Sequence, residues 1–186
     1  MSAPSDEDLI RRIASGDRAA MQGLYARHST AVFRFLVRMV RDPSRAEDLM
    51  SDVFFDVWQQ AGRFESRSSV TTWMLTIARF KALSTLRRRP HEELEPEMAE
   101  TIEDEADTPE VTLQKASKAD AMRRCLEALS LEHRTVIDLV YYHELAVDEV
   151  ARVLDIPAGT VKTRLFHARK RLSDLLLKAG VDRGWP

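Results

Sequence analysis

Residues 158–172, AGTVKTRLFHARKRL, carry the side chains with the clearest chemical purpose in this chain of 186 residues. Val161, Leu165, Ala168 and Leu172 recur at helical spacing and form one narrow apolar stripe. The other face and its flanks hold basic, hydrogen-bonding and aromatic residues: Thr160, Lys162, Thr163, Arg164, Phe166, His167, Arg169, Lys170 and Arg171. Such a helix fits the major groove of DNA, where its middle reads base edges and its arginines hold phosphates.

The alternative is an ordinary amphipathic surface helix with a solvated basic face. Phe166 argues against it, because an aromatic ring opposite the stripe has no evident core role but can meet a thymine methyl group. The preceding residues predict a second helix that ends before Pro157, a residue that disfavours helix at the position before it. Small Ala151 would let the two helices approach closely. The pair predicts a helix-turn-helix over residues 145–172.

Composition argues against most other classes of protein. The chain has one cysteine, Cys125, so an internal disulfide is excluded, and we expect this residue to pack in a helix. No Cys/His cluster has zinc spacing, no nucleophile–base set stands out, and no glycine-rich loop could hold a phosphate. We therefore expect no catalysis, metal or cofactor. The polar start is not a signal peptide, no apolar run could span a membrane, and a cytoplasmic location is expected.

Charge divides the chain into three parts, although the whole carries only −2. Residues 1–90 hold 15 basic and 10 acidic residues, and residues 113–186 hold 13 basic and 10 acidic. Between them, residues 91–112 hold 10 acidic residues and no Lys or Arg. Their composition cannot bury enough apolar surface to fold alone, so we expect a flexible acidic linker.

Apolar periodicity predicts helices throughout the rest of the chain. Ser5 with Asp8 resembles a capping box for a first short helix, and Asp17 caps a longer, central one. His133 and His143 are lone histidines that we expect at the surface. The predicted fold is all-α, with two small helical domains, residues 1–90 and 113–178, joined by the linker 91–112 and followed by a tail, 179–186.

Residues 145–172, LAVDEVARVLDIPAGTVKTRLFHARKRL, closely resemble region 4 of extracytoplasmic-function sigma factors, group IV of the bacterial sigma-70 family. The resemblance implies that this domain binds the minus-35 promoter element as duplex DNA. The family usually has glycine where this chain has Asp155. Aspartate adopts a left-handed turn conformation at modest cost, so this departure is mild.

Residues 45–60, RAEDLMSDVFFDVWQQ, resemble the pattern A-E-D-L-x-Q-E-x-F-x-x-x-W of region 2 in the same family. Spacing alone would suggest a surface helix with a solvated acidic face. The resemblance instead implies contacts with the β′ clamp helices of RNA polymerase, made by Asp48, Leu49, Asp52, Phe54, Val57 and Trp58. Ser51 replaces the usual glutamine, and Asp52 replaces the usual glutamate with a shorter carboxylate.

In the family, the loop and helix that follow read the melted minus-10 element, and one extruded base enters a pocket built by the loop. Carried onto this chain, the loop candidates are Phe64, Glu65, Ser66, Arg67, Ser68 and Ser69. On the helix, from about residue 70 to residue 89, the candidates are Trp73, Arg79, Phe80, Lys81, Arg87 and Arg88. Plain core packing is the alternative for Trp73. Phe80 and Ser84 replace the usual Asn and Asp, and the sequence leaves open whether Phe80 is buried or offers a stacking face.

The resemblance implies a promoter-specificity subunit that binds core RNA polymerase, through its β′ clamp helices and β flap, together with promoter DNA. It also implies an anti-sigma partner and a stress or envelope response, and no homo-oligomer is expected. Family linkers thread the RNA channel of the polymerase, whereas a solvated tether is the alternative here. Two other functions stay open: a sigma-like decoy that titrates an anti-sigma factor, and a plain helix-turn-helix regulator.

Overall fold

The computed structural model describes residues 4–88 and 109–181, and from residue 109 to residue 117 it describes the backbone alone. Helices account for every regular element within these ranges, so the predicted all-α fold is confirmed. The chain divides into two compact units. The first comprises residues 1–97 and 145–156, and the second comprises residues 98–144 and 157–186. Most of the acidic linker, with Arg89, and the end of the tail lie outside the described residues.

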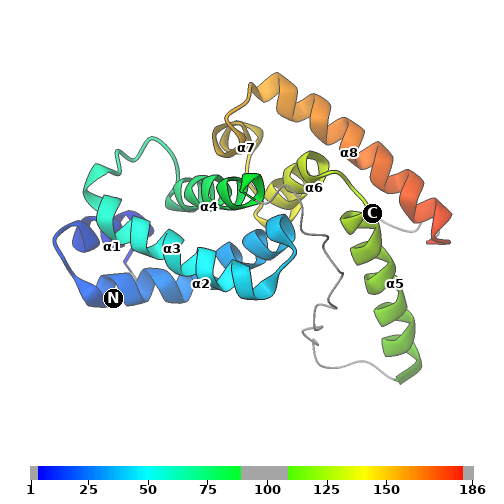
Figure 1. Cartoon of the computed structure of the whole chain (residues 1–186), viewed down its shortest axis with the longest axis horizontal. Coiled ribbons are helices and arrows are strands. Elements are labelled where there is room, and N and C mark those ends of the chain that lie inside the picture. The colour runs from blue at the N-terminus through cyan, green and yellow to red at the C-terminus, as the bar shows by residue number, and fades with distance from the viewer. Residues whose placement is uncertain (1–3, 89–108, 182–186) are drawn as a thin grey trace. The chain divides into compact units, whose positions relative to one another are not determined.

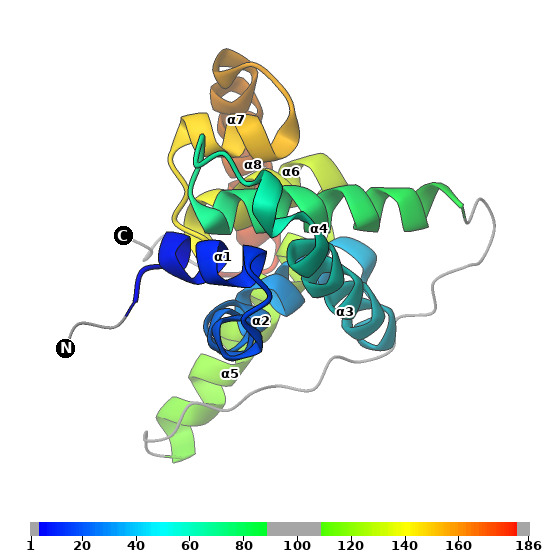
Figure 2. The ribbon, with the colours of Figure 1, turned by 90° about the vertical axis from the view of Figure 1, so that its left-hand side faces the viewer.

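The first unit is built around α2 (Arg18–Val40), which packs against α1 (Asp6–Ala14), α3 (Pro43–Gln60) and α4 (Val70–Arg87). Figures 1 and 2 show these four helices grouped together. Phe35, Leu24, Leu36, Val53 and Met74 are fully buried at their centre. A short 3-10 turn, η1 (Ala61–Arg63), follows α3, and α7 (Val147–Leu154) packs against α4.

Side-chain caps explain where the helices of this unit begin. Ser5 and Asp8 form the predicted capping box of α1, and Asp17 accepts a hydrogen bond from the backbone N–H of Ala20 at the start of α2. Asp42 caps α3, with Pro43 in its first turn, where a missing N–H costs nothing. Ser69 caps α4 by accepting from the N–H of Thr72.

The second unit contains α5 (Pro109–Glu127), α6 (Leu131–Ile137) and α8 (Ala158–Lys178), and both α5 and α6 pack against α8. Ser130 caps α6, and Cys125 is buried, as expected for a packing residue. Val136, Leu139, Val161 and Ala168 are fully buried in this unit.

A π-helical turn, η2 (Asp138–Tyr142), continues α6, and no pattern of residues predicted it. Here the expectation for His143 was wrong. Its side chain is only 4% exposed, and its Nε2 lies 3.4 Å from a carboxylate oxygen of Asp138, which is equally buried. The π turn brings Asp138 and His143 together. The backbone N–H of His143 bonds to the carbonyl of Asp138, five residues earlier, instead of to a residue four positions earlier as in an α-helix.

Candidate nucleic-acid and polymerase interfaces

The apolar stripe of α8 is the side of the helix that the second unit covers. Val161 and Ala168 are fully buried, Leu165 is nearly so, and Leu172 is half-buried. Apart from Arg164, the rest of the predicted reading face is exposed, with Phe166 at 64%. Its other exposed members are Thr160, Lys162, Thr163, His167, Arg169 and Lys170. An aromatic ring of that exposure, beside basic and hydroxyl side chains, suits contact with base edges and phosphates.

Two arginines of α8 have partners that the sequence did not reveal. The Arg164 guanidinium is half-buried and lies 3.2 Å from a carboxylate oxygen of Glu132 on α6, so a phosphate contact by Arg164 would compete with this ion pair. The Arg169 guanidinium lies 5.4 Å from the ring centre of Tyr141, within cation–π range. Tyr141 is 52% exposed and was not among the residues predicted for DNA binding. It therefore joins the candidate site as the ring that orients Arg169.

The turn between α7 and α8 confirms the conformation expected for Asp155, which ends α7 with φ of 53° in the left-handed region. Glu144, just before α7, also has φ of 53°. The N-cap position of α7 is Ala146, which has no side-chain acceptor, and the Glu149 carboxylate accepts from its backbone N–H at 3.1 Å instead.

The other carboxylate oxygen of Glu149 reaches α4. It accepts hydrogen bonds from the hydroxyl of Ser69 at 3.0 Å and from the hydroxyl of Thr72 at 2.9 Å. Burial raises the pKa of Glu149, but these bonds and the Ala146 N–H outweigh it and hold the pKa below its ordinary value. The carboxylate thus stays charged at neutral pH, bonded to both helices.

The predicted polymerase face of α3 needs a correction. Leu49, Phe54 and Val57 are at most 6% exposed, so they belong to the core, and the Phe54 ring packs 4.7 Å from the ring of Tyr25. Asp48 and Asp52 are exposed, and Trp58 is half-buried. Phe55, 59% exposed, was not predicted. It follows Asp48 and Asp52 at helical spacing, and this signal could have identified it.

The loop after α3 places an aromatic pair at its base. The ring centres of Phe64 and Trp73 lie 5.0 Å apart at an angle of 44°, and both side chains are half-buried. Ser66 is in the left-handed region, with φ of 53°, and Arg67 pairs with Glu65 at 2.6 Å. Glu65, Ser66, Arg67 and Ser69 are exposed, and Ser68 is half-buried. Trp73 therefore packs against the loop and positions Phe64.

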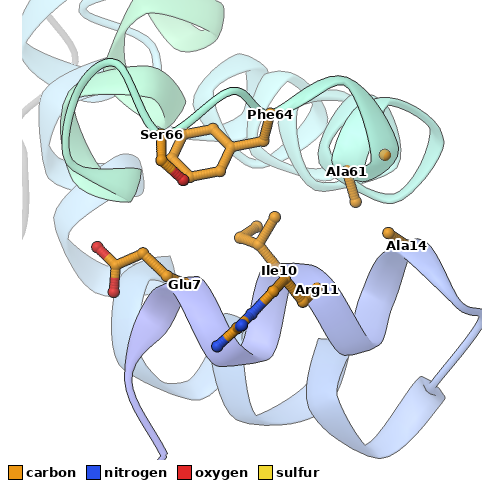
Figure 3. A pocket seen from close by; sticks show the side chains of 8 residues that line it. Glu7, Ile10, Arg11, Ala14, Ala61, Phe64 and Ser66 are labelled. Atoms are coloured by element: carbon orange, nitrogen blue, oxygen red, sulfur yellow. The ribbon is translucent and has the colours of Figure 1, made fainter.

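A pocket of about 450 Å³ lies between this loop and α1, as Figure 3 shows. Phe64 and Ser66 line it from the loop, and Ala61 and Gly62 line it from η1. The opposite wall comes from α1, through Glu7, Ile10, Arg11 and Ala14, which sequence reasoning did not connect with the loop. The pocket combines one aromatic ring with charged and hydroxyl groups.

One of the basic residues predicted to bind DNA on α4 has a partner within the fold. Arg87 and Arg88 are exposed and Arg79 is half-buried, but the Lys81 ammonium lies 2.9 Å from the Asp56 carboxylate of α3. Lys81 therefore joins α3 to α4. Phe80 is 73% exposed, which answers the question that the sequence left open: its ring offers a free face on the surface.

Among the described residues, no helix is both long and apolar enough to cross a membrane. No three potential metal-ligating side chains lie together in the same part of the chain.

Comparison with known proteins identifies both domains. Residues 24–91 match the family model for sigma-70 region 2, and residues 119–172 match the model for sigma-70 region 4. The ECF RNA polymerase sigma factor SigK of Mycobacterium tuberculosis is 32% identical over 178 residues, with 92% of this chain and 94% of SigK covered. The RNA polymerase sigma-H factor of Pseudomonas aeruginosa is 26% identical, with 95% and 96% covered.

Solved structures share the fold. CnrH in complex with the cytosolic domain of CnrY has a TM-score of 0.68 at 24% identity, covering 93% of this chain and 97% of CnrH. RpoE of Bartonella quintana in complex with the anti-sigma factor NepR has a TM-score of 0.71, also at 24% identity, covering 87% and 98%. The chain belongs to the extracytoplasmic-function sigma factors. It is a promoter-specificity subunit, whose partners are core RNA polymerase and promoter DNA.

Proposed function

We propose that this sigma factor divides promoter recognition among three surfaces. The exposed face of α8 reads the minus-35 duplex, the loop of residues 64–69 with α4 reads the melted minus-10 strand, and the acidic stripe of α3 binds the polymerase clamp. The observation that carries the proposal is on α8, where Lys162, Phe166 and Lys170 stand exposed opposite an apolar stripe that is buried from Val161 to Ala168.

On α8, Lys162, Thr163 and Phe166 are the proposed base readers. Each good base contact gives roughly 1–3 kcal/mol of discrimination against the wrong base. Arg169 and Lys170 hold phosphates, which adds affinity for any sequence and makes binding sensitive to salt. Tyr141 keeps the Arg169 guanidinium oriented through its ring.

On the first unit, an extruded base of the minus-10 strand enters between the loop and α1. Unstacking a base costs a few kcal/mol, and contacts in the pocket must offset that cost. Phe64 supplies a stacking surface that Trp73 supports, and Arg11 and Glu7 supply charged hydrogen-bonding groups. Phe80 offers a second stacking surface, and Arg87 and Arg88 attract the strand's phosphates.

The proposed polymerase contact on α3 is the stripe of Asp48, Asp52 and Phe55, with Trp58 beside it. An exposed aromatic residue flanked by carboxylates suits a partner with a basic rim around an apolar patch. The proposed domain boundaries are residues 1–90 for region 2 and 113–178 for region 4. The proposed role of the acidic linker, residues 91–112, is to thread the RNA channel of the polymerase, and it is supported by the family resemblance and by the linker's negative charge.

An anti-sigma factor is the proposed regulator. The solved structures with the same fold include a sigma factor bound to the anti-sigma factor NepR and CnrH bound to CnrY. A protein of this kind would cover the polymerase and DNA surfaces until a stress or envelope signal releases them. The protein acts in the cytoplasm with its polymerase and performs no catalysis itself. The intact reading face of α8 disfavours a decoy.

Run-off transcription tests the proposal directly. The purified protein, core RNA polymerase and fragmented DNA from the source organism are combined, and the 5′ ends of the RNA are sequenced. We expect new starts that share one pair of upstream elements. Core binding without new starts would indicate a decoy, and neither core binding nor starts would indicate a plain DNA-binding regulator.

A further inference from the structure

Two buried ionisable side chains of the second unit, Asp138 and His143, have no part in the proposed function. The Asp138 side chain is 3% exposed and the His143 side chain is 4% exposed, and Oδ2 of the first lies 3.4 Å from Nε2 of the second. Burying polar groups costs free energy, but a buried polar pair can select one conformation over a competing one. We propose that this pair positions a DNA-binding residue: it selects the π turn η2, and η2 presents Tyr141 to Arg169.

The pair and the π turn depend on each other. In an α-helix, residues five positions apart point about 140° away from each other, because each residue turns the chain by about 100°. In η2 the backbone N–H of His143 bonds to the carbonyl of Asp138 at 3.2 Å, so these two residues lie one above the other. The contact between their side chains therefore requires the wider turn. Because π turns are rare, a contact that forms only in one provides a physical reason for its presence here.

The π turn also decides where Tyr141 and Tyr142 lie. In an α-helix these residues, three and four positions after Asp138, would share the face of the helix that holds Asp138. That face is buried, because Asp138 is buried. In the structure the two tyrosines are instead 52% and 51% exposed. The wider turn thus places both rings at the surface.

The exposed position of Tyr141 matters for DNA binding, and this step rests on the proposed function. The centre of the Tyr141 ring lies 5.4 Å from the guanidinium of Arg169 on α8. Arg169 is exposed and is proposed to hold a DNA phosphate. An aromatic ring orients a guanidinium without neutralising its charge, so Arg169 stays available to an anion. An α-helical turn in place of η2 would withdraw the ring from Arg169.

Three substitutions separate positioning from stability. Asp138→Leu combined with His143→Leu removes the pair and leaves neither polar group buried, and replacements of this kind are often neutral or stabilising. Asp138→Leu alone provides a second route should the double variant fail to fold. Asp138→Asn is the conservative variant, because it keeps the side-chain size and an oxygen that can accept from the His143 imidazole.

Thr135→Val is the matched control. The Thr135 hydroxyl is buried in α6 and bonds to the carbonyl of Leu131 at 2.6 Å, before η2 begins. This variant therefore removes a buried polar group from the same helix without touching the pair.

The first measurement is nitration of tyrosines by tetranitromethane in the folded, full-length protein, read by mass spectrometry. The chain has three tyrosines, and Tyr25, 43% exposed in the first unit, is the internal standard. Relative to Tyr25, nitration of Tyr141 and Tyr142 should fall severalfold in the double leucine variant. It should keep its wild-type level in Asp138→Asn and in Thr135→Val.

The second measurement is the Kd of the holoenzyme, assembled with core polymerase, for a promoter fragment recovered by run-off transcription and for the same fragment with a mutated minus-35 element. The double leucine variant should bind both duplexes about two- to fivefold more weakly than wild type, as Tyr141→Leu does. Adding Tyr141→Leu to it should cause no further loss, because both changes remove the same support of Arg169. Asp138→Asn and Thr135→Val should bind like wild type.

Three results would overturn the inference. Wild-type nitration in a folded double leucine variant would mean that the pair does not select the π turn. Reduced nitration with an unchanged Kd, or a further loss on adding Tyr141→Leu, would mean that the pair does not act on DNA through Tyr141. By contrast, wild-type affinity of Arg169→Ala for every duplex would refute the phosphate contact in the proposed function itself, and the nitration pattern would still report on the pair.

Discussion

A binding face was predicted from sequence for both α8 and α3. The structure exposes most of the predicted residues on α8 but buries half of those on α3. On α8, Val161, Leu165 and Ala168 are buried and the opposite side is exposed, as the spacing indicated. On α3, three of the six predicted contact residues lie in the core. The reason is that α3 packs against four elements, α1, α2, α4 and η1. A larger part of its circumference is therefore buried than one apolar stripe would indicate.

The largest expected effect separates two adjacent phenylalanines of α3. Phe54→Ala should lower the free energy of unfolding by about 3–5 kcal/mol, because it empties a packed core site. Phe55→Ala should leave stability within about 0.5 kcal/mol, because its ring is exposed. Its affinity for core polymerase should nevertheless fall about tenfold or more. Urea unfolding and a core-binding titration measure the two effects. Equal core affinity in Phe55→Ala and wild type would remove Phe55 from the interface.

On α8, base readers and phosphate contacts should behave differently. Lys162→Ala and Phe166→Ala should reduce discrimination between the minus-35 element and a mutated one by roughly 1–3 kcal/mol. Arg169→Ala should weaken binding to both sequences alike and lower the salt slope by about 0.9. Titrations of both duplexes at several salt concentrations measure these effects. If Lys162→Ala lost the same affinity for every sequence, its assignment as a base reader would be wrong.

A third prediction concerns how α1 is held on α2. Burial raises the pKa of Asp6, but the Arg27 and His28 side chains, at 2.8 and 2.7 Å, outweigh it and hold the pKa below its ordinary value. The charged Asp6 therefore stabilises the fold fully at any pH above the pKa that Asp6 has in the unfolded chain. This stabilisation is lost as pH falls through the lower pKa that Asp6 has in the folded protein. Asp6→Asn should therefore cost about 1 kcal/mol at pH 6.

The measurement is urea unfolding of wild type and Asp6→Asn at pH 6 and near pH 3. The difference between the two proteins should shrink on acidification. A difference that stayed constant across this range would mean that the charge of Asp6 does not contribute.

The smallest expected effect tests the partner of Arg169. Tyr141→Leu should weaken binding to all duplexes by about 0.5–1 kcal/mol, since it removes the ring that orients the guanidinium. Tyr141→Phe keeps the ring and should bind like wild type. Loss of affinity in Tyr141→Phe as well would indicate that the phenol hydroxyl contacts DNA directly.

The sequence by itself determined the helices, their caps and the reading face of α8. Those features depend on neighbours within one or two turns: Ser5 bonds to Asp8, and Val161 shares its stripe with Leu165. The left-handed conformation of Asp155 is likewise a local feature of the turn that it ends. The motifs of residues 45–60 and 145–172 likewise sufficed to identify the family.

Only the tertiary structure decided which side chains pair across the fold. Glu149 bonds to residues 77 and 80 positions away, Lys81 is engaged by Asp56, and the pocket at Phe64 takes its second wall from α1. The spacing of apolar residues cannot predict such pairs, because it describes one helix at a time. It does not indicate which other helix will pack against that helix. The buried Asp138 and His143 depended on a π turn, a change in helical pitch that no spacing of side chains announced.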